Sequence, residues 1–115
     1  MPSATTNTTL ILRPDLQTAR EPLVALCEQW QIIELACFGS VLRDDFRPDS
    51  DIDLLVSFAD TARITFFDLD AIERQFSPLF DNRPVDVVTR RAIEQSHNPI
   101  RRHNILSSAQ ILYRR

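Results

Sequence analysis

The stretch of sequence that decides the fold is residues 38–56, FGSVLRDDFRPDSDIDLLV. It begins where a nearly continuous apolar run over 32–38 ends, and such a run predicts a central strand covered on both faces. It ends in residues that alternate between acidic and apolar, which predicts a second strand over 51–58. Between the two predicted strands lie a glycine–serine turn, a short helix expected over 41–43 and a loop that contains Pro48.

Gly39 is the only glycine in the chain, whereas average usage would give roughly eight in a protein of this length. After a buried strand, glycine permits a positive φ and lets a ligand approach the main chain closely. Ser40 adds a hydroxyl and a backbone N–H at the start of the short helix, which can bind an anion. Taken alone, however, a Gly–Ser pair more often marks a plain turn in which the serine caps the helix.

Asp51 and Asp53 are two residues apart, so on a strand their side chains face the same way at a spacing of about 6.5–7 Å. Two carboxylates so placed repel each other unless something positive lies between them. Mg²⁺ is bound in proteins through one or two carboxylates together with substrate phosphates. The pair therefore indicates either a magnesium site or, as the plain alternative, a solvated strand edge.

Asp86 is the sole charge in residues 84–88, PVDVV, which we expect to form a third strand. An acid among valines is unfavourable unless it is paired or binds a metal, so an ion pair with an arginine is the alternative. If this strand lies beside the strand over 51–58, Asp86 can join Asp51 and Asp53. Three carboxylates can then hold a pair of metal ions about 3.5–4 Å apart.

Hydrophobic spacing and turn residues predict the remaining elements of the chain. They are a helix that starts between Asp15 and Pro22 and ends near Trp30, a helix over 66–79, a short helix over 90–95, a helix from Asn98 as N-cap to about Ser107, and a final strand or tail over 111–113. The predicted fold class is α+β (α/β-like), a small mixed sheet of three to four strands with helices packed on one side. We expect one domain over 1–115, with a loose tail over 1–9.

Two local features carry expectations of their own. Thr18 and Glu21 have the spacing of a capping box for the first helix. Only one of Phe66 and Phe67 can face the core on a helix, so the other either joins a partner surface or, as the simpler interpretation, packs on the second side of the helix start.

The composition excludes several classes of function. The net charge is −3, so we expect no broad nucleic-acid footprint and no direct nucleic-acid binding. No stretch reaches the length of a membrane span, and Cys27 and Cys37 fit no zinc or redox spacing, so we expect buried free thiols and a cytoplasmic protein. All thirteen basic residues are arginine, and six of them lie over 90–115 with one glutamate. This segment either meets a polyphosphate or an acidic partner or is a solvated surface.

The pattern of Gly-Ser, ten residues, Asp-x-Asp and a later lone Asp on a strand resembles the DNA polymerase β-like nucleotidyltransferases, in particular their minimal nucleotidyltransferase (MNT) branch. The resemblance spans about residues 20–113 and implies a single domain with the polymerase β-like nucleotidyltransferase fold. It implies that Gly39 and Ser40 hold a triphosphate with help from Arg43. The same resemblance makes Asp51, Asp53 and Asp86 the catalytic carboxylates and the ligands of two Mg²⁺ ions, with Asp86 as a ligand or as the base for the acceptor hydroxyl.

The resemblance also implies an activity and a partner. Proteins that look like this transfer AMP from ATP to a protein hydroxyl, in particular to a tyrosine of a HEPN-domain toxin, and so act as its antitoxin. One departure stands against full activity, because Asp44 occupies a position where the MNT pattern usually has glycine. The alternative is therefore an MNT-like antitoxin that neutralises its partner by binding alone. Transfer to a small molecule or to nucleic acid ranks last, because relatives that do this usually carry a second domain.

Overall fold

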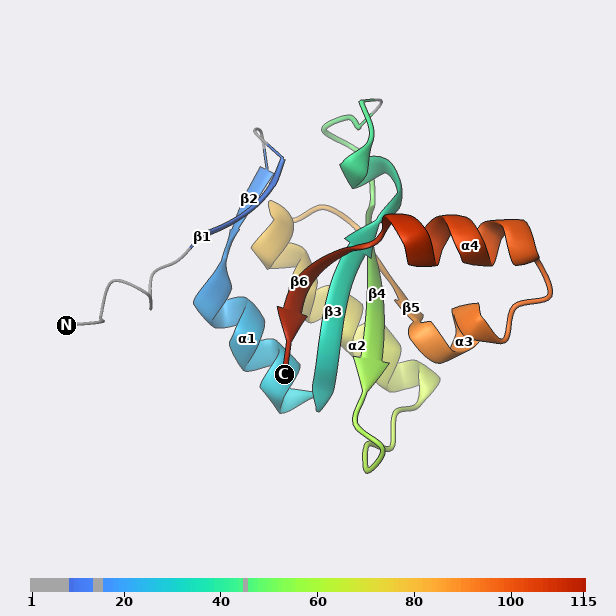
Figure 1. Ribbon diagram of the computed structural model, residues 1–115. Helices are drawn as coiled ribbons and strands as arrows, with labels where there is room; N and C mark the ends of the chain where they lie inside the picture. Colours follow the sequence, from blue (N-terminus) through green and yellow to red (C-terminus); the bar gives the residue numbers. More distant parts are fainter. Residues whose placement is uncertain (1–8, 14–15, 45) are drawn as a thin grey trace.

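The computed structural model describes residues 9–13, 16–44 and 46–115. The elements in chain order are β1 (Thr9–Arg13), β2 (Leu16–Ala19), α1 (Arg20–Gln29), β3 (Ile32–Phe38), the 3₁₀ turn η2 (Gly39–Leu42), β4 (Ile52–Phe58), α2 (Phe66–Phe76), the 3₁₀ turn η3 (Ser77–Phe80), β5 (Val85–Thr89), α3 (Arg90–Glu94), α4 (Pro99–Ser108) and β6 (Gln110–Arg114). Figure 1 shows β1 and β2 standing as a small hairpin beside the main sheet. The expected tail over 1–9 falls almost wholly outside the described residues, and its last residue, Thr9, begins β1.

The main sheet has four strands in the order β5-β4-β3-β6 and is mixed, as predicted. Strand β4 is parallel to β5, whereas β3 is antiparallel to both β4 and β6. The parallel pair needs a crossover, which α2 supplies between β4 and β5 (Figure 1). Residues 111–113, left open between strand and tail, belong to β6 at the edge of the sheet.

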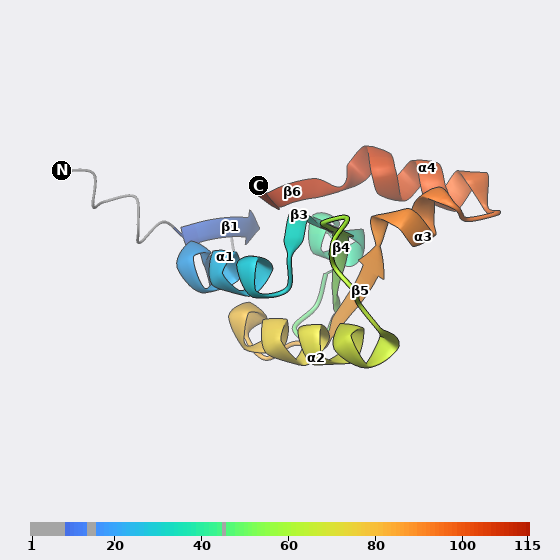
Figure 2. The same cartoon turned by 90° about the horizontal axis from the view of Figure 1, so that it is seen from below.

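Helices cover both faces of this sheet, so the prediction that they pack on one side is wrong. Figure 2 shows α1 and α2 on one face and α3 and α4 on the other. The reason is that both central strands alternate apolar side chains between two cores. Leu35 and Leu54 join the core under α1 and α2, whereas Phe38 and Leu55 join the core formed with Ile105 of α4.

The helix starts differ from the prediction in two places. Helix α1 begins at Arg20, its N-cap is Ala19, and no side chain caps it. The predicted capping box is wrong because Thr18 belongs to strand β2, where it pairs with Leu10 of β1. Pro22 falls in the first turn of α1, where a helix tolerates proline.

At the start of α2, Phe66 and Phe67 are 89% and 87% exposed, so neither packs against this chain. The expectation that at least one of them faces the core is wrong. The inward face of α2 is occupied instead by Ile72 and Phe76, both fully buried, with Leu69 partly buried beside them. None of the helices in the described part of the chain combines the length and apolar character that a membrane crossing requires.

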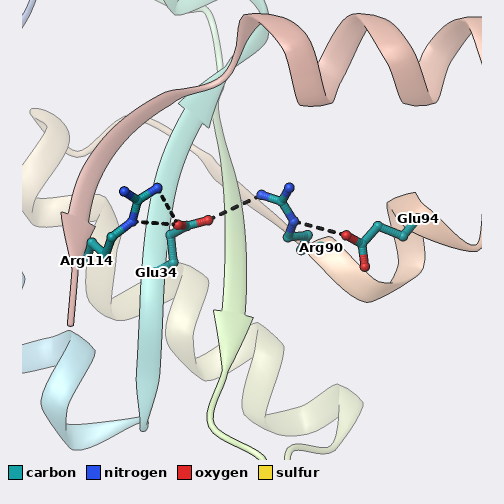
Figure 3. A network of polar contacts seen from close by, with 4 residues as sticks. All are labelled: Glu34, Arg90, Glu94 and Arg114. Carbon is teal, nitrogen blue, oxygen red and sulfur yellow. Dashed lines mark hydrogen bonds and ion pairs between the residues drawn. The ribbon is translucent and has the colours of Figure 1, made fainter.

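A network of ion pairs between side chains connects the C-terminal segment to the centre of the sheet (Figure 3). The carboxylate of Glu34 on β3 accepts from Arg114 Nε of β6 at 2.9 Å and from Arg90 Nη1 of α3 at 3.3 Å. Arg90 also pairs with Glu94 one helical turn later, with 3.1 Å between Nε and Oε2. Two arginines of the basic segment therefore hold α3 and β6 in place, which fixes the elements on either side of α4.

Candidate active site

Gly39 and Asp53 lie in direct contact where strand β3 ends and β4 begins. Gly39 has a φ of +79°, a conformation that other residues rarely adopt. A Cβ atom at this position would collide with the Asp53 carboxylate, because it would lie 3.3 Å from Cγ and closer still to Oδ2. Glycine is therefore required at this position for two reasons. The backbone adopts a positive φ there, and the Asp53 carboxylate leaves no room for a side chain.

The pairing of strands β4 and β5 brings two of the predicted aspartates together. In their parallel register Asp53 lies directly opposite Asp86, and adjacent strands are about 4.8 Å apart. Leu54 and Val87 point into the core under α1 and α2, so the aspartates that precede them point to the other face, on the side of α3 and α4. Asp51 immediately precedes β4 and is exposed.

The charges of Asp86 and Asp51 both act on Asp53, and we refer to these three aspartates as the acid cluster. Burial raises the pKa of Asp53, the charges of Asp86 and then Asp51 raise it further, and Arg43 and Arg101 oppose this rise. Across the described residues, no group of three or more Asp, Glu, His or Cys side chains is arranged to hold a metal ion by itself. The metal-binding role of the three aspartates stays a prediction.

The loop that leads into β4 is anchored by Arg83, a residue that our sequence analysis missed. Its Nη1 donates to the backbone carbonyl of Arg47 at 2.6 Å and to that of Ser50 at 3.4 Å. The guanidinium also lies 4.3 Å from the ring centre of Phe46, which is a cation–π contact. Arg83 sits just before β5, so it ties the approach to Asp51 to the strand that carries Asp86. No sequence motif marks it, because its partners are backbone carbonyls more than thirty residues away.

A cleft of about 460 Å³ opens beside this cluster. One wall is formed by Gly39 and Arg43, and the other by α4 through Asn98, Arg101 and Asn104. Its volume lies in the usual range for small-molecule sites, about 300–1,000 Å³. A larger depression of about 560 Å³ lies at the opposite end of β4 and β5, but none of the predicted site residues lines it.

The remaining predicted residues fall around the same turn. Ser40 is half-buried in η2, and its carbonyl accepts a hydrogen bond from the Arg43 backbone N–H at 2.9 Å. Asp44, the departure from the MNT pattern, is exposed, and the side chains that line the cleft come from other positions. The structure thus gathers Gly39, Ser40, Arg43 and the aspartates at one end of the sheet.

Comparison with known proteins identifies the family and fold of the chain. The nucleotidyltransferase domain family matches residues 20–112. A candidate minimal nucleotidyltransferase of known structure is 33% identical, with a TM-score of 0.58 over 78% of this chain and 85% of its own. A toxin–antitoxin structure with AMP-PNP is 18% identical, with a TM-score of 0.62 over 84% of this chain and 73% of its own. The toxin–antitoxin MntA-HepT is 17% identical, with a TM-score of 0.56 over 84% and 70%.

Among curated proteins, none matches the sequence. The likenesses below 25% identity carry the fold alone, and they agree with the predicted polymerase β-like fold. The family match covers most of the chain. With its turn, its paired aspartates and its four-stranded mixed sheet, this chain belongs to the nucleotidyltransferase domain family, as its resemblance to the minimal nucleotidyltransferases indicated.

Proposed function

We propose that this protein transfers AMP from Mg²⁺-bound ATP to a hydroxyl of a partner protein, a tyrosine of a HEPN-type toxin, and thereby acts as an antitoxin. The observation that carries the proposal is the register of Asp53 and Asp86 on adjacent strands, directly beside the Gly39 turn. Carboxylates that face one another beside a turn able to approach phosphates are what a nucleotidyl transfer requires.

The donor set fits a divalent cation. Asp51, Asp53 and Asp86 are hard oxygen donors. Burial and then the charges of Asp86 and Asp51 raise the pKa of Asp53, and a bound cation would offset both effects. These three residues would hold a pair of Mg²⁺ ions together with phosphate oxygens of the substrate. When bound, Mg²⁺ supplies neutralisation of the triphosphate charge and polarisation of the α-phosphate.

The chain's own residues position the reactants. Gly39 lets the triphosphate approach the main chain, Ser40 offers a hydroxyl, and Arg43 adds a positive charge from the wall of the cleft. The acceptor oxygen attacks the α-phosphorus and forms the new phosphoester bond. The bond from that phosphorus to the bridging oxygen breaks, and pyrophosphate leaves. Asp86 is exposed at the site and is the carboxylate we assign to take the proton of the acceptor hydroxyl.

Support for a toxin as the partner comes from the fold. Two structures with the same fold belong to toxin–antitoxin complexes, and one of these contains AMP-PNP, an analogue of ATP. The chain itself folds into one small sheet whose candidate site is a cleft between the Gly39 turn and α4 that is open to solvent. An open site suits a large acceptor, because a protein can bring its own surface to close over the nucleotide.

The competing function is neutralisation of the toxin by binding alone. Asp44 favours it, because this acid replaces the glycine of the MNT pattern one residue after Arg43. Its exposure at the surface weakens that argument. The two functions differ in one observable, the covalent state of the partner.

The test is intact-protein mass spectrometry of a candidate toxin encoded beside this chain and co-expressed with it. We expect the toxin to gain mass in whole AMP units with the wild-type chain. With Asp53→Asn we expect an unmodified toxin, whereas Asp60→Asn, an exposed acid at the other end of the sheet, should modify it normally. A toxin that is neutralised at its unmodified mass would instead establish masking.

A further inference from the structure

The basic C-terminal segment contains an arginine that lines the cleft and has no structural partner within the described part of the chain. Arg90 and Arg114 pair with Glu34, and Arg102 donates to the Ser96 carbonyl at 2.8 Å. Arg101 differs from these, because none of the residues that the structure describes forms a hydrogen bond or an ion pair with its guanidinium. Its side chain is exposed and lines the cleft.

Helix α4 holds this side chain in a defined place. Ile105 is 7% exposed and anchors the helix in the core with Phe38 and Leu55. Asn98 caps the helix by accepting from the Arg101 backbone N–H at 3.0 Å. The arginine is therefore in the first turn of a helix fixed at its start and in its middle.

The polar residues of α4 that line the cleft lie on one side of the helix. Arg101, Asn104 and Ser108 are three and four residues apart, which places them on a single face. Opposite them, the cleft is bounded by Gly39 and Arg43. The side chains of Arg43 and Arg101 therefore line the same cleft from its two walls.

We propose that Arg101 binds the polyphosphate of the nucleotide from the α4 wall of the cleft, across from the Gly39 turn. The proposal rests on the proposed function, because it takes a nucleoside triphosphate as the substrate. A guanidinium suits this role, since it matches phosphate oxygens in a bidentate way and its charge is permanent. Asn104 lies one turn further along the same face and also lines the cleft. The neighbouring Arg102 serves the fold, whereas Arg101 serves the ligand.

The test compares Arg101→Ala with the wild type in the binding of AMP-PNP with Mg²⁺, measured by calorimetry, and in the KM and kcat for ATP. We expect the affinity to fall about tenfold or more and KM to rise by a similar factor, with little change in kcat. Arg101→Lys should restore part of the affinity. Arg91→Ala, which removes the same charge from an exposed site on α3, should bind like the wild type. Equal melting temperatures would show that the folds are comparable.

Competition locates the contact along the nucleotide. Tripolyphosphate should displace AMP-PNP from the wild type more effectively than from Arg101→Ala, whereas adenosine should compete equally in both. Wild-type affinity for AMP-PNP in Arg101→Ala would overturn the proposal. The proposal would also fail if the substitution weakened competition by tripolyphosphate and by adenosine to the same extent.

The two proposals fail in different ways. If the chain binds AMP-PNP through Arg101 but transfers no AMP, the proposed function fails and the role of Arg101 stands. If transfer requires Asp53 while Arg101→Ala keeps the wild-type KM, the role of Arg101 fails alone. A wild-type chain that does not bind AMP-PNP would overturn both.

Discussion

The carboxylate of Asp53 occupies the space that a side chain on residue 39 would need. This contact links the phosphate turn to the acid cluster, so a change at one affects the other. Gly39→Ala should cost about 1–3 kcal/mol of stability through its positive φ and should also displace the Asp53 carboxylate from its place at the site. Chemical denaturation and AMP transfer measure the two effects. An alanine variant as stable and as active as the wild type would show that the contact has no role.

The raised pKa of Asp53 predicts an unusual dependence of stability on pH. Folding favours the protonated form of this acid, so its contribution is fully present below the ordinary pKa of aspartate and is lost as pH rises through the raised folded value. At neutral pH without metal, Asp53→Asn should therefore be more stable than the wild type, and the difference should shrink in acid. Urea denaturation in EDTA tests this. An Asn variant less stable at neutral pH would contradict the raised pKa of Asp53, which comes from burial and from the neighbouring acids.

Ligand binding should make the wild type more stable than Asp53→Asn, the reverse of the order expected without ligand. Mg²⁺ with AMP-PNP binds the folded state, and a concentration about 100 times the Kd adds about 2.7 kcal/mol of stability. We expect the melting temperature of the wild type to rise, and that of Asp53→Asn to stay nearly unchanged. Asp60→Asn is the control and should respond like the wild type, because it lies at the other end of the sheet. An equal rise in the melting temperature of all three proteins would show that nucleotide binding does not depend on the Asp53 carboxylate.

Arg83 should matter for both stability and activity. Arg83→Ala removes two hydrogen bonds to the loop before β4 and the contact with Phe46. We therefore expect the free energy of unfolding to fall by about 1–3 kcal/mol. Hydrogen exchange should become faster over residues 46–51, and AMP transfer should fall. Arg74→Ala is the matched control, because its exposed pair with Asp70 is worth about 0.3–0.5 kcal/mol. Unchanged exchange in the loop would assign Arg83 no positioning role.

The two cysteines should be inert in the native protein. Burial raises the pKa of Cys27 to about 12 and that of Cys37 to about 11, so both stay protonated at neutral pH. The thiolate is the reactive form, and both side chains are also buried. Iodoacetamide should modify neither residue until the protein is unfolded. Rapid labelling of the native protein would reveal an opening of the core that includes α1 and β3.

Local pattern predicted the parts of the fold that local chemistry decides. The apolar run over 32–38, the acidic alternation before Phe58 and the Asn98 cap all fall where we expected them. The lone glycine also identified the turn that contacts Asp53. Each of these signals lies within one element, and the physics that it reflects acts over a few residues.

The features that escaped prediction depend on long-range contacts. The hairpin of β1 and β2 takes Thr18 away from the helix it was expected to cap, because a strand partner becomes available. Helices cover the second face of the sheet because Phe38 and Leu55 need a core of their own. Arg83 acts on backbone carbonyls, which carry no sequence signal. The alternation of side chains along one strand cannot show which helix or strand packs against each of its faces.

The most direct test of the account is the fate of labelled phosphate from ATP when the chain and its candidate toxin are incubated with Mg²⁺. Label at the α-phosphate should appear on the toxin and label at the γ-phosphate should not, because pyrophosphate leaves. Asp53→Asn should lower the transfer by roughly a hundredfold or more while its fold and its binding to the toxin persist. Label carried from the γ-phosphate, or transfer that continues undiminished in Asp53→Asn, would contradict the account.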